Sequence, residues 1–339
     1  MAARRRWLSR SRVAAVLVGL VWALSGCSSS HPATQRRSGS SSQTTSSTPA
    51  PAPSATAIAR ARPPRLIEVL PAVGRRGLFG WVPAVAVRGQ PAVWISRVAA
   101  EHEAGFTITL LRLDQRLVTL ALHAGGAEPG GSGWRFGDEI GRAERRTIVA
   151  AFNSAFRESY GAGGFMAYGR VGWPLRRGAA SVVIYRDGVA DIGRWREGIP
   201  AAGRAVAAVR QNLGLLIDRG RVPPSVDTCI KVCWGDPLHE QPIVARSGLA
   251  ITSGGDLVWA AGHDLSVRAL AQALLAKGAV RAMELDINPR WVAGYVYSHP
   301  RHRAMPSTVP LVPGQTGIPG DFLQPYFRDF FTVLARPHA

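Results

Sequence analysis

Arg246-Ser-Gly-Leu-Ala-Ile251 and Gly254-Gly-Asp-Leu-Val-Trp259 are two runs rich in apolar residues on either side of a Gly-Gly turn. Such runs around such a turn are typical of a β-hairpin. Ser266 is a good helix N-cap, and an apolar stripe follows it up to Gly278, where a C-terminal cap belongs. We therefore expect a hairpin, a helix between these two caps, and then a strand, Val280-Arg-Ala-Met-Glu-Leu-Asp286, that ends on a carboxylate.

Other parts of the chain carry the same strand signal. At 339 residues and 46% hydrophobic, the chain can bury a substantial core. Helical patterns are few, with one short helix expected over residues 143–148. The sequence therefore predicts a strand-rich α+β fold, with mixed or antiparallel twisted sheets and a few packed helices. The expected strands are Val93–Val98, Gly105–Leu113, Leu117–Leu122, Ala180–Tyr185 and Val189–Trp195.

Four motifs occur in the order found in one known family. They are Ala150-Ala-Phe-Asn-Ser-Ala-Phe156, the segment from Arg210 to Gly220, Arg246-Ser-Gly-Leu-Ala-Ile251 and Met283-Glu-Leu-Asp286. In this order they resemble the phosphodiester glycosidase domain, whose best-known member removes N-acetylglucosamine from a sugar phosphodiester. The resemblance implies that residues 141–339 form such a region. We expect a strand-rich region, 66–140, to join it in one domain.

The resemblance also implies residue roles. Asp286 corresponds to the family's strand-end Asp, and Arg246 matches its Arg, whose guanidinium fork suits a phosphate. The alternative for Arg246 is a structural ion pair. Asn153 would bind sugar hydroxyls or phosphate, or else cap the turn after its strand. The family's glycine pair after the Asp is replaced here by Ile287-Asn288-Pro289, and Pro removes a backbone donor.

The residues near Asp286 suggest further candidates. Glu284 lies two positions before Asp286 on the expected strand, so both carboxylates should face the same side. Glu284 could act with Asp286 in catalysis or be the buried partner of an arginine. His299 could serve as an acid or base, although a lone histidine is more often a surface or packing residue. The substrate-binding candidates are Asn288, Asn212 and Ser154.

The positive charge of the chain is concentrated at its beginning. The formal net charge is +19, but the segment up to Arg65 has ten arginines and no acidic residue. The remainder has 31 basic and 22 acidic residues, a net charge of +9. No basic stripe with interleaved aromatic residues is present, so we expect no nucleic acid partner. A basic patch that favours anionic envelope ligands stays open.

The N-terminus indicates export. Residues 1–27 combine an arginine-rich start, the apolar run Val13–Leu24 and the small-residue end Leu24-Ser-Gly-Cys27. They are similar to a bacterial lipoprotein signal, in which Cys27 would carry the lipid that anchors the protein to the membrane. An ordinary secretory peptide or an uncleaved anchor is the alternative. Residues 28–65, rich in Ser, Thr, Pro and Ala, are expected to form a disordered linker.

The two remaining cysteines agree with an extracytoplasmic location. Cys229 and Cys233 are expected to form a local disulfide in an oxidising compartment. Asp236 and His239 nearby would be the further ligands of a metal site, which lacks a second cysteine pair. We therefore predict no cofactor and assign no metal ligands, while a divalent metal stays open.

Two functions from different classes fit these patterns. One is an envelope-anchored hydrolase that cleaves a glycosyl phosphodiester, acting on a carbohydrate or glycosyl-phosphate substrate. The other is a noncatalytic lipoprotein that binds a glycan or a phosphorylated wall polymer. The missing glycines after Asp286 favour the second.

Overall fold

The computed structural model describes residues 65–336, except 76, 78, 101–102, 162, 237–240 and 301–304. The expected signal with Cys27, the linker up to residue 64 and His239 lie outside the described residues. The chain divides after Arg60, and every described element belongs to the unit Ala61–Ala339.

The largest sheet has eight strands in the order β1-β2-β3-β4-β14-β13-β15-β12, and all its ladders are antiparallel. The opening hairpin of the sequence is its β13 and β14, with Leu249 opposite Trp259. The bounds are β1 Ile67–Val69, β2 Val82–Val87, β3 Gln90–Ala100, β4 Glu103–Leu113, β12 Leu215–Ile217, β13 Val244–Thr252, β14 Leu257–Leu265 and β15 Ala279–Glu284.

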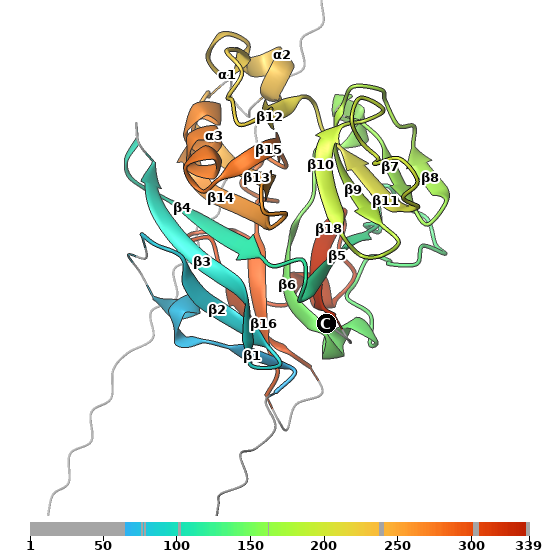
Figure 1. Cartoon of the computed structure of the whole chain (residues 1–339), viewed down its shortest axis with the longest axis vertical. Helices are drawn as coiled ribbons and strands as arrows, with labels where there is room; N and C mark the ends of the chain where they lie inside the picture. Colours follow the sequence, from blue (N-terminus) through green and yellow to red (C-terminus); the bar gives the residue numbers. More distant parts are fainter. Residues whose placement is uncertain are drawn as a thin grey trace, which may run out of the picture. The chain divides into compact units, whose positions relative to one another are not determined.

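Two five-stranded antiparallel sheets complete the strand structure (Figure 1). One has the order β10-β9-β11-β7-β8, and the other β17-β16-β6-β18-β5. Their bounds are β5 Val118–His123, β6 Ile148–Asn153, β7 Phe165–Ala167, β8 Arg170–Trp173, β9 Ala180–Tyr185, β10 Ala190–Arg194, β11 Val206–Gln211, β16 Gly294–Ser298, β17 Ser307–Pro310 and β18 Phe330–Ala335.

Three α-helices occur among the described residues: α1 Ser225–Thr228, α2 Ile230–Trp234 and α3 Val267–Ala276. The longest, α3, begins as expected, because the hydroxyl of Ser266 accepts a hydrogen bond from the Ala269 N–H. Its apolar face packs on β13, β14 and β15 (Figure 1). The helix expected over residues 143–148 is only the short 3-10 turn Glu144–Arg146. The predicted strand-rich α+β class is confirmed.

The main core joins all three sheets. It includes Trp259 of the large sheet, Phe152 and Phe331 of the β6 sheet, and Val182 of the β9 sheet. Burial of each such side chain contributes about 1.5–3 kcal/mol. Trp259 stacks on Phe152 with ring centroids 5.4 Å apart, and a Cβ at Gly294 would lie 2.4 Å from the indole. This packing brings β14 of the large sheet against β6 and β16.

None of the described helices has both the length and the apolar character that a membrane crossing requires.

Candidate functional site

A cavity of about 290 Å³ lies beside the loop that follows β15. Its floor is built from residues that come from distant parts of the chain, and one of them is the carboxylate of Asp286. The lining residues are Phe156, Arg157, Tyr160, Leu213, Lys231, Val232, Gly235, Asp236, Asp286, Ile287, Asn288, Trp291 and Arg328.

Asp286 is held in place by its backbone and its carboxylate. Its carbonyl accepts hydrogen bonds from the backbone N–H and the hydroxyl of Ser247, each at 3.0 Å. One carboxylate oxygen accepts the backbone N–H of Asn288 at 2.9 Å, and the other lies 3.2 Å from the guanidinium of Arg328. Burial raises the pKa of Asp286, while the positive charge of Arg328 and the backbone N–H groups oppose that rise. The carboxylate is therefore a better base than an exposed Asp.

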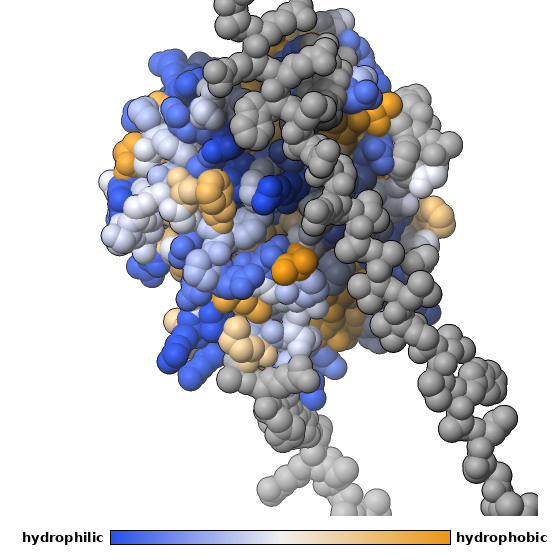
Figure 2. Space-filling model, turned by 180° about the vertical axis from the view of Figure 1, so that it is seen from behind, coloured by the Kyte–Doolittle hydropathy of each residue, from blue (hydrophilic) through white to orange (hydrophobic). Residues whose placement is uncertain are grey.

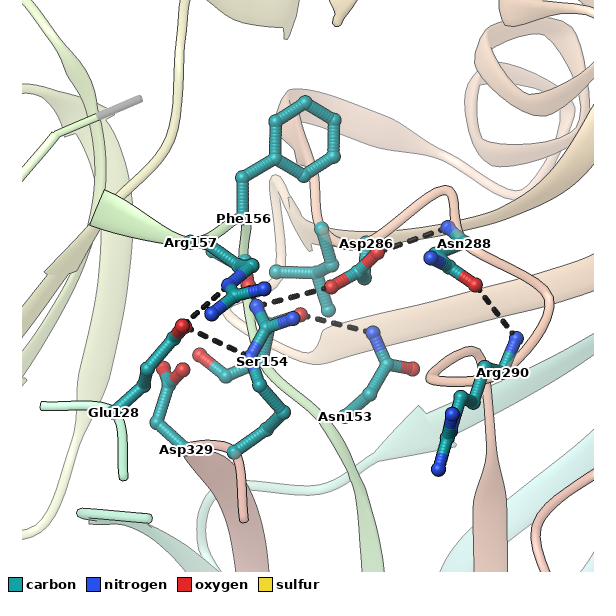
Figure 3. Close-up of polar contacts among 12 residues, drawn as sticks. Glu128, Asn153, Ser154, Phe156, Arg157, Asp286, Asn288, Arg290 and Asp329 are labelled. Atoms are coloured by element: carbon teal, nitrogen blue, oxygen red, sulfur yellow. Dashed lines mark hydrogen bonds and ion pairs between the residues drawn. The ribbon is translucent and has the colours of Figure 1, made fainter. Parts of the chain in front are cut away.

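A chain of alternating charges leads away from Asp286 (Figure 3). Arg328 pairs with Asp286 and, through Nε, with a carboxylate oxygen of Glu128 at 3.1 Å, and Glu128 also binds Arg157. Arg328 in addition donates to the carbonyl of Ala155 at 2.8 Å. These contacts fix the guanidinium of Arg328, so its position against Asp286 is set before any ligand arrives.

A second buried pair supports this chain from behind. Arg210 binds the carboxylate of Asp329 at 2.7 Å and also donates to the carbonyl of Phe156, a lining residue. Both side chains of the pair are fully buried. The pair therefore joins β11 to the segment that carries Arg328.

Aromatic rings form one side of the cavity. Trp291 lines it and stacks on Phe327, with the ring planes 9° apart and the centroids separated by 6.2 Å. The guanidinium of Arg328 lies 5.5 Å from the centre of the Trp291 ring. The indole thus contacts both an aromatic ring and a cation, and it contributes an aromatic side chain to the cavity lining.

Helix α2 also contributes to the cavity lining. Lys231 and Val232 of this helix line the cavity, and the disulfide Cys229–Cys233 brackets them, as the cysteine spacing predicts. Gly235 has φ +86°, and a Cβ there would lie 2.3 Å from the Phe156 ring. Only glycine allows the chain to pass this close at that conformation.

Arg246 and Glu284 do not line the cavity and instead form an ion pair, the alternative to a catalytic role that the sequence leaves open for each. Glu284 pairs across the sheet with Gly248, two residues from Arg246 on the same face, and the missing side chain at Gly248 lets the guanidinium reach the carboxylate at 2.7 Å. Arg246 also donates to the carbonyls of Leu265 and Pro242. Its exposed fraction is 0%, so it has no surface to offer a phosphate.

The electrostatics of Glu284 follow from that burial. Burial raises its pKa to about 7, Arg246 opposes the rise, and the charge of Asp286 adds to it. The two carboxylates therefore influence each other, but they point to different arginines. Glu284 acts here as the buried partner of an arginine, one of the two roles that the sequence allows.

Two of the expected site residues, Asn153 and Asn212, have a structural role, because their side chains hydrogen-bond neighbouring segments of the fold. Asn153 donates to the Ser247 hydroxyl at 2.8 Å and accepts from the backbone N–H of Ala293, so it ties β6 to β13 and β16. Asn212 donates to the carbonyls of Glu284 and Leu285 at 2.8 and 2.9 Å. Both side chains are buried, and neither lines the cavity.

Of the remaining expected residues, one lines the cavity and two do not. Asn288 lines the cavity, whereas Ser154 is buried beside it with no hydrogen-bond partner for its hydroxyl among the described residues. His299 is not brought to Asp286. Its ring binds the carbonyl of Ile148, at the opposite end of β6 from Asn153, about 16 Å away at the rise of a strand.

No group of three or more His, Cys, Asp or Glu side chains in the described part of the chain is arranged to hold a metal ion.

A larger groove, of about 1210 Å³, is a weaker candidate. Its carboxylates lie beside arginines: Asp114 beside Arg116, Asp187 beside Arg204 and Asp256 beside Arg112. Hydrogen bonds from Arg116 hold the pKa of Asp114 below its usual value. Burial raises the pKa of Asp256, but its side chain is 30% exposed, whereas Asp286 is almost completely buried. The smaller cavity is therefore better suited to proton transfer.

Sequence reasoning missed several lining residues. Arg328 lies in a C-terminal tail that aromatic residues mark as core, and a charged Arg-Asp pair inside that aromatic run was the available signal. Lys231 and Trp291 carry no local signal, because only the tertiary structure brings them to the cavity.

No family model matches the sequence, and no curated protein matches it. Several solved structures are similar at low identity, and three of them are described here. The zebrafish N-acetylglucosamine-1-phosphodiester alpha-N-acetylglucosaminidase catalytic domain, auto-inhibited by its pro-peptide, has TM-score 0.46 and 14% identity, covering 72% of this chain and 82% of that chain. A hypothetical protein from Synechocystis has TM-score 0.39 and 14% identity, covering 74% and 65%. A protein described as exported, from Burkholderia pseudomallei, has TM-score 0.34 and 10% identity, covering 68% and 74%.

Proposed function

We propose that this protein is an extracytoplasmic hydrolase that cleaves a glycosyl phosphodiester, with Asp286 as the catalytic carboxylate. One observation carries the proposal: Asp286 is a buried carboxylate of raised pKa on the floor of a cavity whose wall also holds Arg157, Lys231 and Trp291. Carboxylate, cations and an aromatic face match the three parts of such a substrate: anomeric carbon, phosphate and sugar ring.

In the proposed reaction Asp286 takes a proton from water as the water oxygen bonds to the anomeric carbon. The bond from that carbon to the phosphate oxygen breaks, and its electron pair leaves with the phosphate monoester. Lys231 and Arg157 stabilise the departing negative charge. The proton on Asp286 then passes to the phosphate or to solvent, which restores the carboxylate.

The proposed location follows from the disulfide and the N-terminus. A disulfide between Cys229 and Cys233 favours an oxidising compartment. We further propose that Cys27 is lipidated and anchors the protein to the membrane. Mass spectrometry of the membrane fraction for a diacylglyceryl Cys27, absent in Cys27→Ala, tests this anchor.

The test of function is release of free sugar from methyl N-acetylglucosamine-1-phosphodiester by the purified full chain. Asp286→Asn should lower kcat by about 10²–10⁴-fold, the usual contribution of a positioned base. Asp187→Asn, a surface carboxylate outside the cavity, is the matched control and should keep wild-type turnover. Full activity in Asp286→Asn would refute the assignment of Asp286. Loss of activity in EDTA would indicate that the reaction requires a divalent metal ion.

One observation favours the alternative, a noncatalytic lipoprotein that binds a glycan or phosphorylated wall polymer. Among the described residues that line the cavity, the carboxylate besides Asp286 is the exposed Asp236, whereas glycosidases ordinarily use two positioned carboxylates. Saturable binding of the phosphodiester by a folded protein that releases no sugar would establish this alternative.

A further inference from the structure

The cavity changes character from its floor to its mouth. Asp286 and Arg328 are almost completely buried, and so is Phe156, so these residues form the floor. Tyr160 and Val232 line the same cavity but are 66% and 88% exposed, so they form its mouth. A ligand that fills the cavity therefore meets the Asp286–Arg328 pair and Phe156 deep inside. At the mouth it meets the apolar side chains of Tyr160 and Val232 next to exposed charged groups.

Exposed apolar residues gather at this mouth. Phe327, stacked on the lining residue Trp291, is 49% exposed and extends the apolar rim. On the part of the face of Figure 2 that is coloured, hydrophobic residues occur as small separate patches within a hydrophilic surface. Scattered exposed apolar residues need no explanation, whereas apolar residues gathered around a cavity mark a site for an apolar ligand group.

The cations lie directly beside the apolar rim. Lys231 precedes Val232 in α2, and Arg157 lies three residues before Tyr160 in the loop after β6. The disulfide Cys229–Cys233 closes across the two α2 residues, and both of them line the cavity. A phosphate bound by these cations would carry its second ester group towards the apolar rim.

We propose that the second ester of the substrate is an apolar alcohol, so that the enzyme acts on a glycosyl phosphodiester of lipid type. This rests on the proposed function. Hydrolysis then releases the free sugar from the floor and an alkyl phosphate at the mouth, with water supplying the oxygen to the sugar and a proton to the phosphate. The apolar rim holds the alkyl group, and the sugar ring lies inside.

The experiment compares methyl, octyl and benzyl esters of N-acetylglucosamine-1-phosphate as substrates of the full chain. Each methylene moved from water onto an apolar surface favours binding by up to about fourfold. We expect kcat/KM to rise by at least about tenfold from methyl to octyl. Equal kcat/KM for the benzyl and octyl esters would assign the rim to a short aromatic alcohol. Equal values for methyl and octyl, with active enzyme, would overturn the inference and leave the proposed function standing.

Variants and a binding measurement separate the two proposals. The double variant Tyr160→Ser, Val232→Ser should lower the octyl-to-methyl ratio by about fivefold or more, as expected from the lost apolar contact. Val171→Ser, another exposed valine but on β8, is the matched control and should keep the ratio. Octyl and methyl phosphate binding is also measured by calorimetry. Tighter octyl binding without hydrolysis of any ester would remove the proposed function and keep an apolar phosphoester site. Equal affinities for octyl and methyl phosphate would rule out the apolar phosphoester site.

Discussion

Arg328→Gln should move the acidic limb of the pH profile of kcat/KM to higher pH. In the proposed reaction Asp286 must be ionised to accept a proton from water, so activity rises as pH passes its pKa. Arg328 lies 3.2 Å from this carboxylate and stabilises its ionised form. Removing the positive charge disfavours ionisation, raises the pKa of Asp286 and delays the rise in activity.

The size of the effect follows from the contact. A unit charge pair at 3.2 Å interacts by about 5 kcal/mol at an effective dielectric constant of about 20. Water entering the site and the hydrogen bond from Asn288 reduce this, and an adjacent arginine typically lowers a carboxyl pKa by about 1–3 units. The limb should therefore move up by about 1–3 pH units. At a pH well below the acidic limb of both proteins, kcat/KM of Arg328→Gln should therefore be about 10–1000-fold lower than that of the wild type.

The assay is sugar release between pH 4 and pH 9, with thermal melting of each variant to check that it is folded. Glu128→Gln is a control with the opposite expected effect. Glu128 contacts Arg328 at 3.1 Å, so removing its negative charge leaves the positive charge of Arg328 less compensated and stabilises the ionised form of Asp286. It should not move the limb upwards. An unchanged limb in Arg328→Gln, in a protein that melts like the wild type, would refute the role of Asp286 as the base.

Two further predictions concern stability. Hydrogen bonds from Arg116 hold the pKa of Asp114 below its usual value, so their contribution is present above the ordinary pKa and lost as pH falls through the lower folded pKa. Asp114→Asn should therefore cost about 1 kcal/mol in urea unfolding at pH 7 and almost nothing near pH 2, and a constant difference would contradict this. Gly294→Ala should cost about 1–3 kcal/mol and lower Tm, because its Cβ would lie 2.4 Å from the Trp259 ring. Gly80→Ala, with nothing within 4 Å of its Cβ, is the control, and equal melting of the two variants would be the contrary result.

The fold could be predicted where its signals are local. The two glycines after Thr252 make the β13–β14 turn, Ser266 caps α3, and Gly278 follows its end. Each signal acts within a few residues, so the sequence alone locates these elements. The strand order cannot be found in this way, because β4 pairs with β14 across more than a hundred residues.

The site could be predicted only in part for the same reason. Asp286 and Asn288 follow directly from the end of a recognisable strand and line the cavity. Arg246 and Glu284 are polar residues in apolar strands, and a pattern of residue types does not reveal that they face each other beneath α3. Arg328 comes from the far end of the chain, and only the tertiary structure places it against Asp286.

The disulfide between Cys229 and Cys233 makes the structure of the cavity wall depend on the oxidation state of two cysteines. It closes a loop of only a few residues, so it constrains little of the unfolded chain and acts mainly on α2 itself. None of the described sheets contains either cysteine, so the sheets do not depend on this bridge, whereas α2 and the cavity wall that it forms do. In the proposed extracytoplasmic location, oxidation of the two thiols would therefore complete the cavity only after export.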